Sequence, residues 1–535
     1  MTRLQTLTGQ HFIDGQRVGS GEPLLQSLRA ADGQPTGASF YSATAQEAGL
    51  AAGAAQRVFP DFVHSSPDTR AGLLETIADE LDGLGEDFFD IAHQETALPL
   101  ARLQGERART SGQMRMFAGL LRRGDAFAAR IDTAQPQRAP LPRPDLRQYQ
   151  LGLGPVAVFG ASNFPLAFST AGGDTAAALA AGCPVVVKAH PGHMATAELT
   201  ALAVLRALER CRLPGAIFNL IFGTDIGAEL VRHPAIQAVG FTGSLRGGKA
   251  LQQIASQRPQ PIPVFAEMSA VNPLLILPES LRQQPEALAR ALCDSFTLGV
   301  GQFCTKPGLV LAIGGEAFDR FREALSQTVS EVEPQVMLNR QTLDHYQQKL
   351  ALAQRHPDFR LLAAGKAAEK GQARTCVYQV PASALLAKDP LLQEEIFGPV
   401  TLLVEVRDES ELMAALGALQ GQLTATLHAE ADDAALAGRL LPLLSEKAGR
   451  VLFNGYPTGV EVCDAMVHGG PWPATTDARG TSVGTLAIAR FMRPVCLQNA
   501  PASLLPPALR DENPLNLLRL VNGQWTREAI SPAVD

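Results

Sequence analysis

The chain has 535 residues, of which 46% are hydrophobic and 19% are charged, and its formal net charge at pH 7 is −7. This length exceeds what one hydrophobic core supports, so two or three substructures are expected, and the composition is too apolar for a disordered chain. No block of Lys or Arg resembles a phosphate-tracking stripe, which argues against nucleic acid as a partner.

The seven cysteines have no CxxC or His-rich spacing, which argues against a disulfide framework and against a zinc site. The first fifteen residues lack the apolar core of a signal peptide, and the longest apolar stretch, residues 176–187, is short and interrupted. We therefore expect a cytoplasmic protein with reduced thiols, no bound metal and no contact with a membrane.

The N-terminal third predicts a hairpin, a helical layer and an extended connection, in that order. FIDGQRV has Asp14-Gly15 at a two-residue turn, and LVNGQWT near the C-terminus repeats the device with Asn522-Gly523; both are expected as surface hairpins. Between residues 46 and 121, apolar residues recur three and four apart, which predicts helices. The Pro-, Gln- and Arg-rich residues 124–148 predict an extended connection.

Two series of apolar runs follow, each alternating with helical segments. Strands that alternate with helices predict parallel, doubly wound sheets, which bind ligands at the carboxyl ends of their strands. The tail that follows residue 498 is interrupted by prolines and is expected to pack over another surface. The first series comprises VAVFG, VVVKA, AIFNLIFG, AVGFTG and PVFAEM, and the second PLLIL, LVLAIG, VTLLVEV and RVLFNG.

Three side chains in these segments have the chemistry of a covalent enzyme. Cys304, in GVGQFCTKPG, lies in a glycine-bounded turn where a thiol can be exposed and reactive, although a lone cysteine is more often a small buried hydrophobe. Asn163, directly after a strand, can donate to an oxyanion, and Glu267, at a strand end, can act as a general base. Taken singly, these two residues are better explained as a turn asparagine and a satisfied strand-end carboxylate.

The order of six motifs is more specific than any of them alone. ASNFP, VVVKA, FTGS, FAEMS, GQFCT and EEIFGP follow one another as in the aldehyde dehydrogenase superfamily, and the chain resembles that family from about residue 40 to about residue 495. FGASNFPLAFSTAGGDTAAALAAGCPVVVKAH and HGGPWPATTD are similar to the branch that contains α-ketoglutaric semialdehyde (2,5-dioxopentanoate) dehydrogenases and NADP-linked fatty aldehyde dehydrogenases.

The resemblance implies an α/β fold with two doubly wound parallel-sheet domains and a β-arm for oligomerisation. Residues 1–140 and 156–272 would form a dinucleotide-binding domain and residues 273–488 a catalytic domain. Residues 141–155 and 489–510 would form the arm, and residues 511–535 a tail that packs on the surface. Because family members bridge subunits through such an arm, a homodimer or a dimer-based tetramer is expected.

The resemblance also implies roles for the three reactive side chains. Cys304 would attack the aldehyde and carry first a thiohemiacetal and then a thioester. The Asn163 amide and the Cys304 backbone N–H would stabilise the oxyanion, and Glu267 would activate the water that releases the acid.

Four further residues are implied in cofactor binding. Gly243 and Ser244 would approach the pyrophosphate at a helix start, where backbone N–H groups favour anions. Glu395 would hold the hydroxyl groups of the nicotinamide ribose, and Phe397 would pack near the nicotinamide.

The chain departs from the family after the strand VVVKA. Family members commonly read Lys-Pro-small-Glu where this chain has Lys188, Ala189, His190 and Pro191, so the carboxylate that would grip a ribose 2′-hydroxyl is missing. Lys188 and His190 offer positive character to a 2′-phosphate, which favours NADP, with NAD as the possible second cofactor. Lys188 can instead reach solvent, and His190 can be a surface turn residue.

The expected substrate residues are Arg109, Gln113, Phe168 and His468. One stripe of a helix that borders the substrate entrance in the family carries Arg102, Glu106, Arg109 and Gln113, although such charged stripes are usually solvated faces. Ala171 and Gly172 replace the aromatic residue and the lysine that the family often carries, which predicts a locally rebuilt tunnel. His468 would be an auxiliary base or a polar wall, if it is not an ordinary loop histidine.

The expected reaction is the NAD(P)-dependent oxidation of α-ketoglutaric semialdehyde to 2-oxoglutarate, with a fatty aldehyde as the alternative substrate. A catalytically silent structural member of the fold is the alternative from another class, and the presence of Cys304 and Glu395 argues against it. A CoA-acylating dehydrogenase is a third alternative, which the presence of Glu267 weakens.

Overall fold

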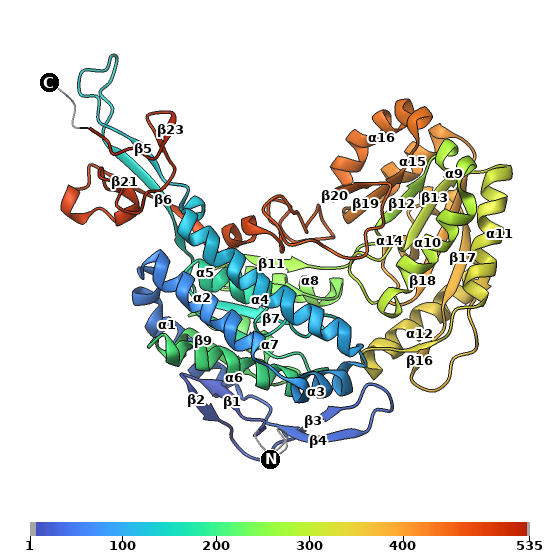
Figure 1. Ribbon diagram of the computed structural model, residues 1–535, viewed down its shortest axis with the longest axis horizontal. Helices are drawn as coiled ribbons and strands as arrows, with labels where there is room; N and C mark the ends of the chain where they lie inside the picture. Colours follow the sequence, from blue (N-terminus) through green and yellow to red (C-terminus); the bar gives the residue numbers. More distant parts are fainter. Residues whose placement is uncertain (1–6, 532–535) are drawn as a thin grey trace.

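The computed structural model describes residues 7–531 and shows two α/β domains side by side, with an arm that extends away from the first of them (Figure 1). A seven-stranded sheet lies at the centre of each domain, and a five-stranded sheet forms the arm. Two further pairs of strands, β3 (Leu25–Leu28) with β4 (Pro35–Phe40) and β14 (Gln335–Val336) with β16 (Gln372–Ala373), form small separate sheets. None of the helices within residues 7–531 is long and apolar enough to cross a bilayer.

The first domain has the strand order β11-β10-β7-β8-β9-β1-β2, in which β7 to β11 are parallel and the β1–β2 hairpin is antiparallel. Alternate residues of β7 pack into core clusters on opposite faces, so helices cover the sheet on both sides. The strands are β1 (His11–Ile13), β2 (Gln16–Val18), β7 (Val156–Phe159), β8 (Val185–Lys188), β9 (Phe218–Ile221), β10 (Ala238–Thr242) and β11 (Val264–Glu267).

Helices α2 to α6 cover one face of this sheet, and α1, α7 and α8 cover the other. Helix α1 begins with a capping box, in which the Thr44 hydroxyl accepts from the backbone of Glu47 and the Glu47 carboxylate accepts from that of Thr44. The helices are α1 (Ala45–Val63), α2 (Pro67–Asp82), α3 (Glu86–Thr96), α4 (Leu100–Arg123), α5 (Gly173–Ala180), α6 (Met194–Arg210), α7 (Gly227–Arg232) and α8 (Leu245–Ser256).

The second domain has the strand order β15-β17-β18-β13-β12-β19-β20, and only β15 runs antiparallel to its neighbour. Helices α9 to α11 cover one face, and α12, α13, α15 and α16 cover the other. The strands are β12 (Pro273–Ile276), β13 (Leu309–Ile313), β15 (Arg360–Ala364), β17 (Cys376–Pro381), β18 (Val400–Val406), β19 (Gln422–His428) and β20 (Ala448–Phe453). The helices are α9 (Pro278–Gln283), α10 (Pro285–Thr297), α11 (Glu316–Ser330), α12 (Arg340–Arg355), α13 (Ala382–Leu386), α14 (Pro390–Gln393), α15 (Glu409–Ala418) and α16 (Ala434–Lys447).

The sequence pattern missed β15, β17 and β19. Strand β19 reads QLTATLH and is buried along its whole length, yet polar residues stand at every second position. The burial of two of these side chains is offset by hydrogen bonds: Thr424 donates from its hydroxyl to the Asn272 side chain over 3.0 Å, and the Gln422 side chain accepts from the backbone of Val271 over 2.9 Å.

The arm has the strand order β21-β6-β5-β22-β23, which differs from the expected division of the chain in two ways. Residues 130–132 pair with β6 in the arm and not with the first domain. The tail does not simply pack on a surface: its β22–β23 hairpin adds to the sheet because β22 pairs with the open edge of β5. The strands are β5 (Arg130–Asp132), β6 (Leu146–Gly152), β21 (Met492–Gln498), β22 (Arg519–Val521) and β23 (Gln524–Thr526).

The two predicted hairpin turns are confirmed, with φ of 53° at Asp14 and 49° at Asn522. The first is not wholly a surface hairpin, because β1 pairs with β9 and is buried. A further difference concerns residues 474–476, which were expected in the second domain: they continue the first sheet beyond β11, where Glu267 pairs with Thr475. This pairing brings the segment that precedes residue 485 back to the end of β11.

Candidate active site

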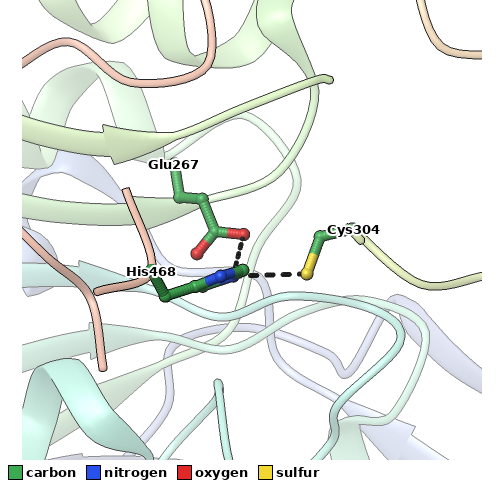
Figure 2. Close-up of side chains that lie close together, drawn as sticks. All are labelled: Glu267, Cys304 and His468. Carbon is green, nitrogen blue, oxygen red and sulfur yellow. Dashed lines mark hydrogen bonds and ion pairs between the residues drawn. The ribbon is translucent and has the colours of Figure 1, made fainter. Parts of the chain in front are cut away.

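Three reactive side chains meet where the first sheet ends (Figure 2). Glu267 is the last residue of β11, Cys304 lies in the loop before β13, and His468 lies in the long segment after β20. His468 Nε2 lies 3.4 Å from Cys304 Sγ and 2.9 Å from Glu267 Oε1. One polar atom from each of the three side chains lies within 4.8 Å of the other two. The atoms are close enough to exchange protons and also to hold a metal ion, and the spacing of these residues in the sequence did not indicate a metal site.

Cys304 is a half-buried thiol in an acidic setting. Burial raises its pKa well above the ordinary value, and the carboxylates of Glu267 and Glu395 raise it further, against a smaller opposing effect of Arg109. The resting enzyme therefore holds a protonated thiol, and a base must remove the proton before Cys304 can attack a carbonyl.

Glu267 is the base that the geometry provides. Burial opposes its ionisation most strongly, yet the adjacent His468, with hydrogen bonds from His468, Ser482 and Cys304, holds its pKa below the ordinary value. The Ser482 hydroxyl donates to Glu267 Oε2 over 2.8 Å. An ionised carboxylate that touches the thiol can accept its proton.

Asn163 lies at the loop that carries the nucleophile. Its side-chain amide donates to the backbone carbonyl of Gln302, two residues before Cys304, over 2.9 Å. Asn163 therefore lies close to the Cys304 loop. In this structure its amide donates to the Gln302 carbonyl and does not point to a vacant oxyanion position.

Asn272 holds the same loop and was missed in the sequence. Its amide donates to the carbonyls of Cys304 (2.8 Å) and Lys306 (3.1 Å), and its side-chain oxygen accepts from Thr424. Asn272 has a φ of 50°, a left-handed conformation that asparagine tolerates. Its place immediately before Pro273 is the only signal that the sequence offered.

Glu106 also has a role that the sequence did not reveal. It was grouped with a charged stripe, but it is only 3% exposed, and its Oε1 accepts from the backbone N–H groups of Leu166 and Ala167, each over 2.9 Å. Arg102 pairs with its other oxygen over 2.9 Å. Glu106 therefore fixes the loop that follows Asn163.

Arg109 faces the substrate side of the nucleophile. Its guanidinium carbon lies 5.7 Å from the ring centroid of Phe164 and 5.4 Å from that of Phe168. Its Nε and one Nη are buried without a hydrogen-bond partner among residues 7–531, and burial lowers its pKa. Phe168 in turn lies 6.2 Å from the His468 ring, so an aromatic wall joins Arg109 to the catalytic cluster.

Ala171 and Gly172 are tightly packed. Ala171 packs in the main core of the first domain and not with the aromatic wall. A side chain at Gly172 would collide with the backbone of Ala167, because a Cβ there would lie 2.5 Å from the carbonyl oxygen. The locally rebuilt tunnel stays a prediction. Gln113 is buried beside Gly173 at the start of α5, and none of its described contacts is with the aromatic wall.

The start of α8 fits an anionic group. Gly243 and Ser244 are exposed between β10 and α8, and the Ser244 hydroxyl accepts from the backbone of Gly247 over 3.1 Å. The start of α6, in contrast, is already occupied, because the backbone N–H groups of Ala195 and Thr196 donate to the Glu95 carboxylate. Of these two helix N-termini, α8 is the one left for an external phosphate.

Glu395 presents an unsatisfied oxygen. Its Oε1 is buried and has no hydrogen-bond partner in the described part of the chain. Burial raises its pKa to about 8, Lys306 opposes this rise, and Glu267 adds to it. An oxygen that lacks a donor fits the hydroxyl groups of a ribose. Phe397, two residues later, is half-buried in the same loop.

Lys188 and His190 lie at the end of β8 as expected, but only Lys188 supplies charge. Burial lowers the pKa of Lys188 to about 8, against the opposing carboxylate of Asp225. Burial, with the adjacent His193 and Lys188, holds the pKa of His190 well below its ordinary value. His190 accepts from the Gly192 backbone over 3.0 Å and stacks on His193. The expectation that His190 offers positive character is therefore wrong at neutral pH.

Comparisons with known proteins show the family to which the chain is similar. The sequence profile of the aldehyde dehydrogenase family matches residues 20–475. The chain is 56% identical to an α-ketoglutaric semialdehyde dehydrogenase of Acinetobacter baylyi, over 97% of this chain and 99% of that protein. It is 51% identical to α-ketoglutaric semialdehyde dehydrogenase 2 of Azospirillum brasilense, over the same shares of the two chains.

Among solved structures, a betaine aldehyde dehydrogenase double mutant from Staphylococcus aureus in complex with NAD⁺ has the same fold. Its TM-score is 0.79 at 20% identity, over 93% of this chain and 98% of that chain. Enzymes of the matched family use NAD or NADP. The chain therefore belongs to the aldehyde dehydrogenase family.

Proposed function

We propose that the protein oxidises α-ketoglutaric semialdehyde (2,5-dioxopentanoate) to 2-oxoglutarate, with NADP as the preferred cofactor and NAD as a second one. The substrate is the one in the names of the two relatives at 56% and 51% identity. The observation that carries the proposal is Arg109, a desolvated guanidinium with two unpartnered nitrogens beside the catalytic cysteine. A carboxylate at the far end of the aldehyde is the natural partner for such a group.

The first half of the reaction uses the cluster of Figure 2. Glu267, supported by His468, accepts the proton of Cys304, and the sulfur forms a bond to the aldehyde carbon. The Asn163 amide and the Cys304 backbone N–H would stabilise the oxyanion, once the amide exchanges the Gln302 carbonyl for the substrate. A bound nicotinamide would supply the acceptor for the hydride that leaves this carbon, and a thioester would remain on Cys304. Glu267 releases the thiol proton to solvent before it acts again.

The second half uses the same carboxylate as a base toward water. Glu267 takes a proton from a water molecule, which attacks the thioester carbonyl; the carbon–sulfur bond breaks and the acid leaves. The Ser482 hydroxyl on one oxygen and His468 beside the other hold the carboxylate in place between the two halves.

The cofactor would lie along the carboxyl ends of the first sheet. Gly243 and Ser244 at the start of α8 would hold the pyrophosphate, and Glu395 and Phe397 the nicotinamide riboside. Lys188 would reach the adenosine ribose, and its charge, without a following acid, favours a 2′-phosphate.

The arm supports the proposal that the protein is a homodimer or a dimer-based tetramer. Strand β21 lies at one edge of the arm sheet and has unpaired backbone groups on its outer side among residues 7–531. All seven cysteines are free, which fits a reducing cytoplasm.

A substrate panel tests the function. Initial rates of reduced-cofactor formation are measured with 2,5-dioxopentanoate, pentanal and a long alkyl aldehyde, each with NAD and NADP. The highest kcat/KM is expected for 2,5-dioxopentanoate with NADP. A preference for the long alkyl aldehyde would replace the semialdehyde by the fatty-aldehyde alternative, and thioester formation with added CoA would indicate an acylating enzyme.

A further inference from the structure

Lys306 is a buried lysine that the reaction does not use. It lies two residues after Cys304 and is 1% exposed. Its ammonium group donates to the carbonyls of Ile396 and Val400, each over 2.9 Å. These two carbonyls flank the turn that contains Phe397, immediately after Glu395.

The two loops also interlock through their backbones. Gly301, before Cys304, has a φ of 64°, and a Cβ at this position would lie 2.2 Å from the carbonyl oxygen of Gly398. The Asn272 amide donates to the backbone carbonyl of Lys306 and also to that of Cys304. The nucleophile loop, residues 299–308, and the ribose loop, residues 395–400, are therefore packed as one unit with an ammonium group inside it.

We propose that Lys306 is a positioning residue for the nicotinamide cofactor: its ammonium group ties the ribose loop to the nucleophile loop and so holds the Glu395 carboxyl group in place. The inference rests on the proposed role of Glu395 at the ribose. A buried ammonium with two fixed carbonyl partners sets the loop geometry, and its charge favours the anionic carboxylate, which accepts hydroxyl hydrogen bonds more strongly.

The electrostatics agree with this assignment. Burial raises the pKa of Glu395 to about 8 and lowers that of Lys306 to about 8, and each group opposes the shift of the other. The other titratable groups that act on Glu395 or feel it are Glu267 and Cys304. Removal of the ammonium would raise the pKa of Glu395 further.

The test compares Lys306→Met with Lys447→Met. Lys447 is a matched control, because its ammonium also donates to two backbone carbonyls, those of Gly417 (2.9 Å) and Leu419 (2.5 Å), at the end of α16. Equilibrium binding of NADP is measured by titration calorimetry from neutral to alkaline pH, together with alkylation of Cys304 by iodoacetamide in the absence of cofactor.

Lys306→Met is expected to weaken NADP binding at least about tenfold at neutral pH, as for the loss of a hydrogen bond to a charged group. The pH range over which binding strengthens should lie higher than in the wild type, because loss of the ammonium raises the pKa of Glu395 further, and the alkylation rate should stay within about threefold of wild type. Lys447→Met should leave both unchanged. The double variant with Glu395→Gln should bind no more weakly than Glu395→Gln alone, since Lys306 acts through that carboxylate.

Additive losses in the double variant, or unchanged NADP binding in Lys306→Met, would overturn the inference. If Lys306→Met does not fold, Lys306→Gln, which keeps a donor for the carbonyls, should show the same pH-dependent loss. Unchanged cofactor binding in Glu395→Gln alone would instead contradict the proposed cofactor site.

Discussion

Replacement of Arg109 by methionine separates the role of its charge from that of its stem. Methionine keeps an unbranched apolar chain against Phe164 and Phe168 but removes the guanidinium. In the free protein this group has already lost much of its hydration, and its Nε and one Nη lack partners within the described chain. A substrate carboxylate therefore gains two charged hydrogen bonds without a further cost for desolvating the arginine.

The expected loss in kcat/KM follows from the desolvated state of the Arg109 guanidinium. Truncation of one partner in a buried charged pair costs about 2 to 3 kcal/mol, which corresponds to roughly 30- to 150-fold in rate. Arg109→Met should reduce kcat/KM for 2,5-dioxopentanoate by that factor and for pentanal by less than about threefold. The variant should unfold at the same or a higher temperature, because it removes a buried unpaired cation.

Steady-state kinetics with both aldehydes provide the measurement, and Arg115→Met provides the control. Arg115 lies on the same helix but is half exposed and pairs with Asp79 and Asp82, so its loss should change neither rate. Equal losses for the charged and the neutral aldehyde in Arg109→Met would refute the reasoning, because Arg109 would then act on the fold and not on the carboxylate.

Four further outcomes are expected. Cys304→Ala should abolish turnover while the Kd for NADP, measured by calorimetry, stays within about threefold, since the nucleophile is lost and the cofactor residues remain; substantial turnover would contradict covalent catalysis. Glu267→Gln should suppress the burst of reduced cofactor in rapid-mixing experiments, because the protonated thiol loses its base; a stoichiometric burst followed by slow acid release would show that Glu267 acts only on the water. Lys188→Ala should raise the KM for NADP more than that for NAD, whereas equal increases would dismiss a 2′-phosphate contact. Alkylation of Cys304 in the free enzyme should accelerate with pH beyond the range of an ordinary thiol, because burial and two carboxylates raise its pKa; a plateau near neutral pH would indicate a thiolate already present at rest.

Local features of the molecule were predictable from the sequence. The Asp14-Gly15 and Asn522-Gly523 turns follow from the left-handed conformations that these residues tolerate, and most strands of the two central sheets follow from short apolar runs. Asn163 and Glu267 were recognised because a strand end in a parallel sheet faces the ligand side. Strand β19 was not, since its alternating polar residues resemble an exposed segment, and the partner of Thr424, Asn272, lies far away in the sequence.

Tertiary structure decided which distant groups meet and in what state of charge. Glu267, Cys304 and His468 come from segments up to 201 positions apart, and only the return of residues 474–476 to β11 places the histidine between the other two. Glu106 changed from an expected solvated charge to a buried loop anchor, and His190 from an expected cation to a neutral ring. The tail hairpin joined the arm because β5 offered an unpaired edge. Backbone preferences act between neighbours and can be read along the chain, whereas burial, charge and pairing depend on which surfaces come together in the fold.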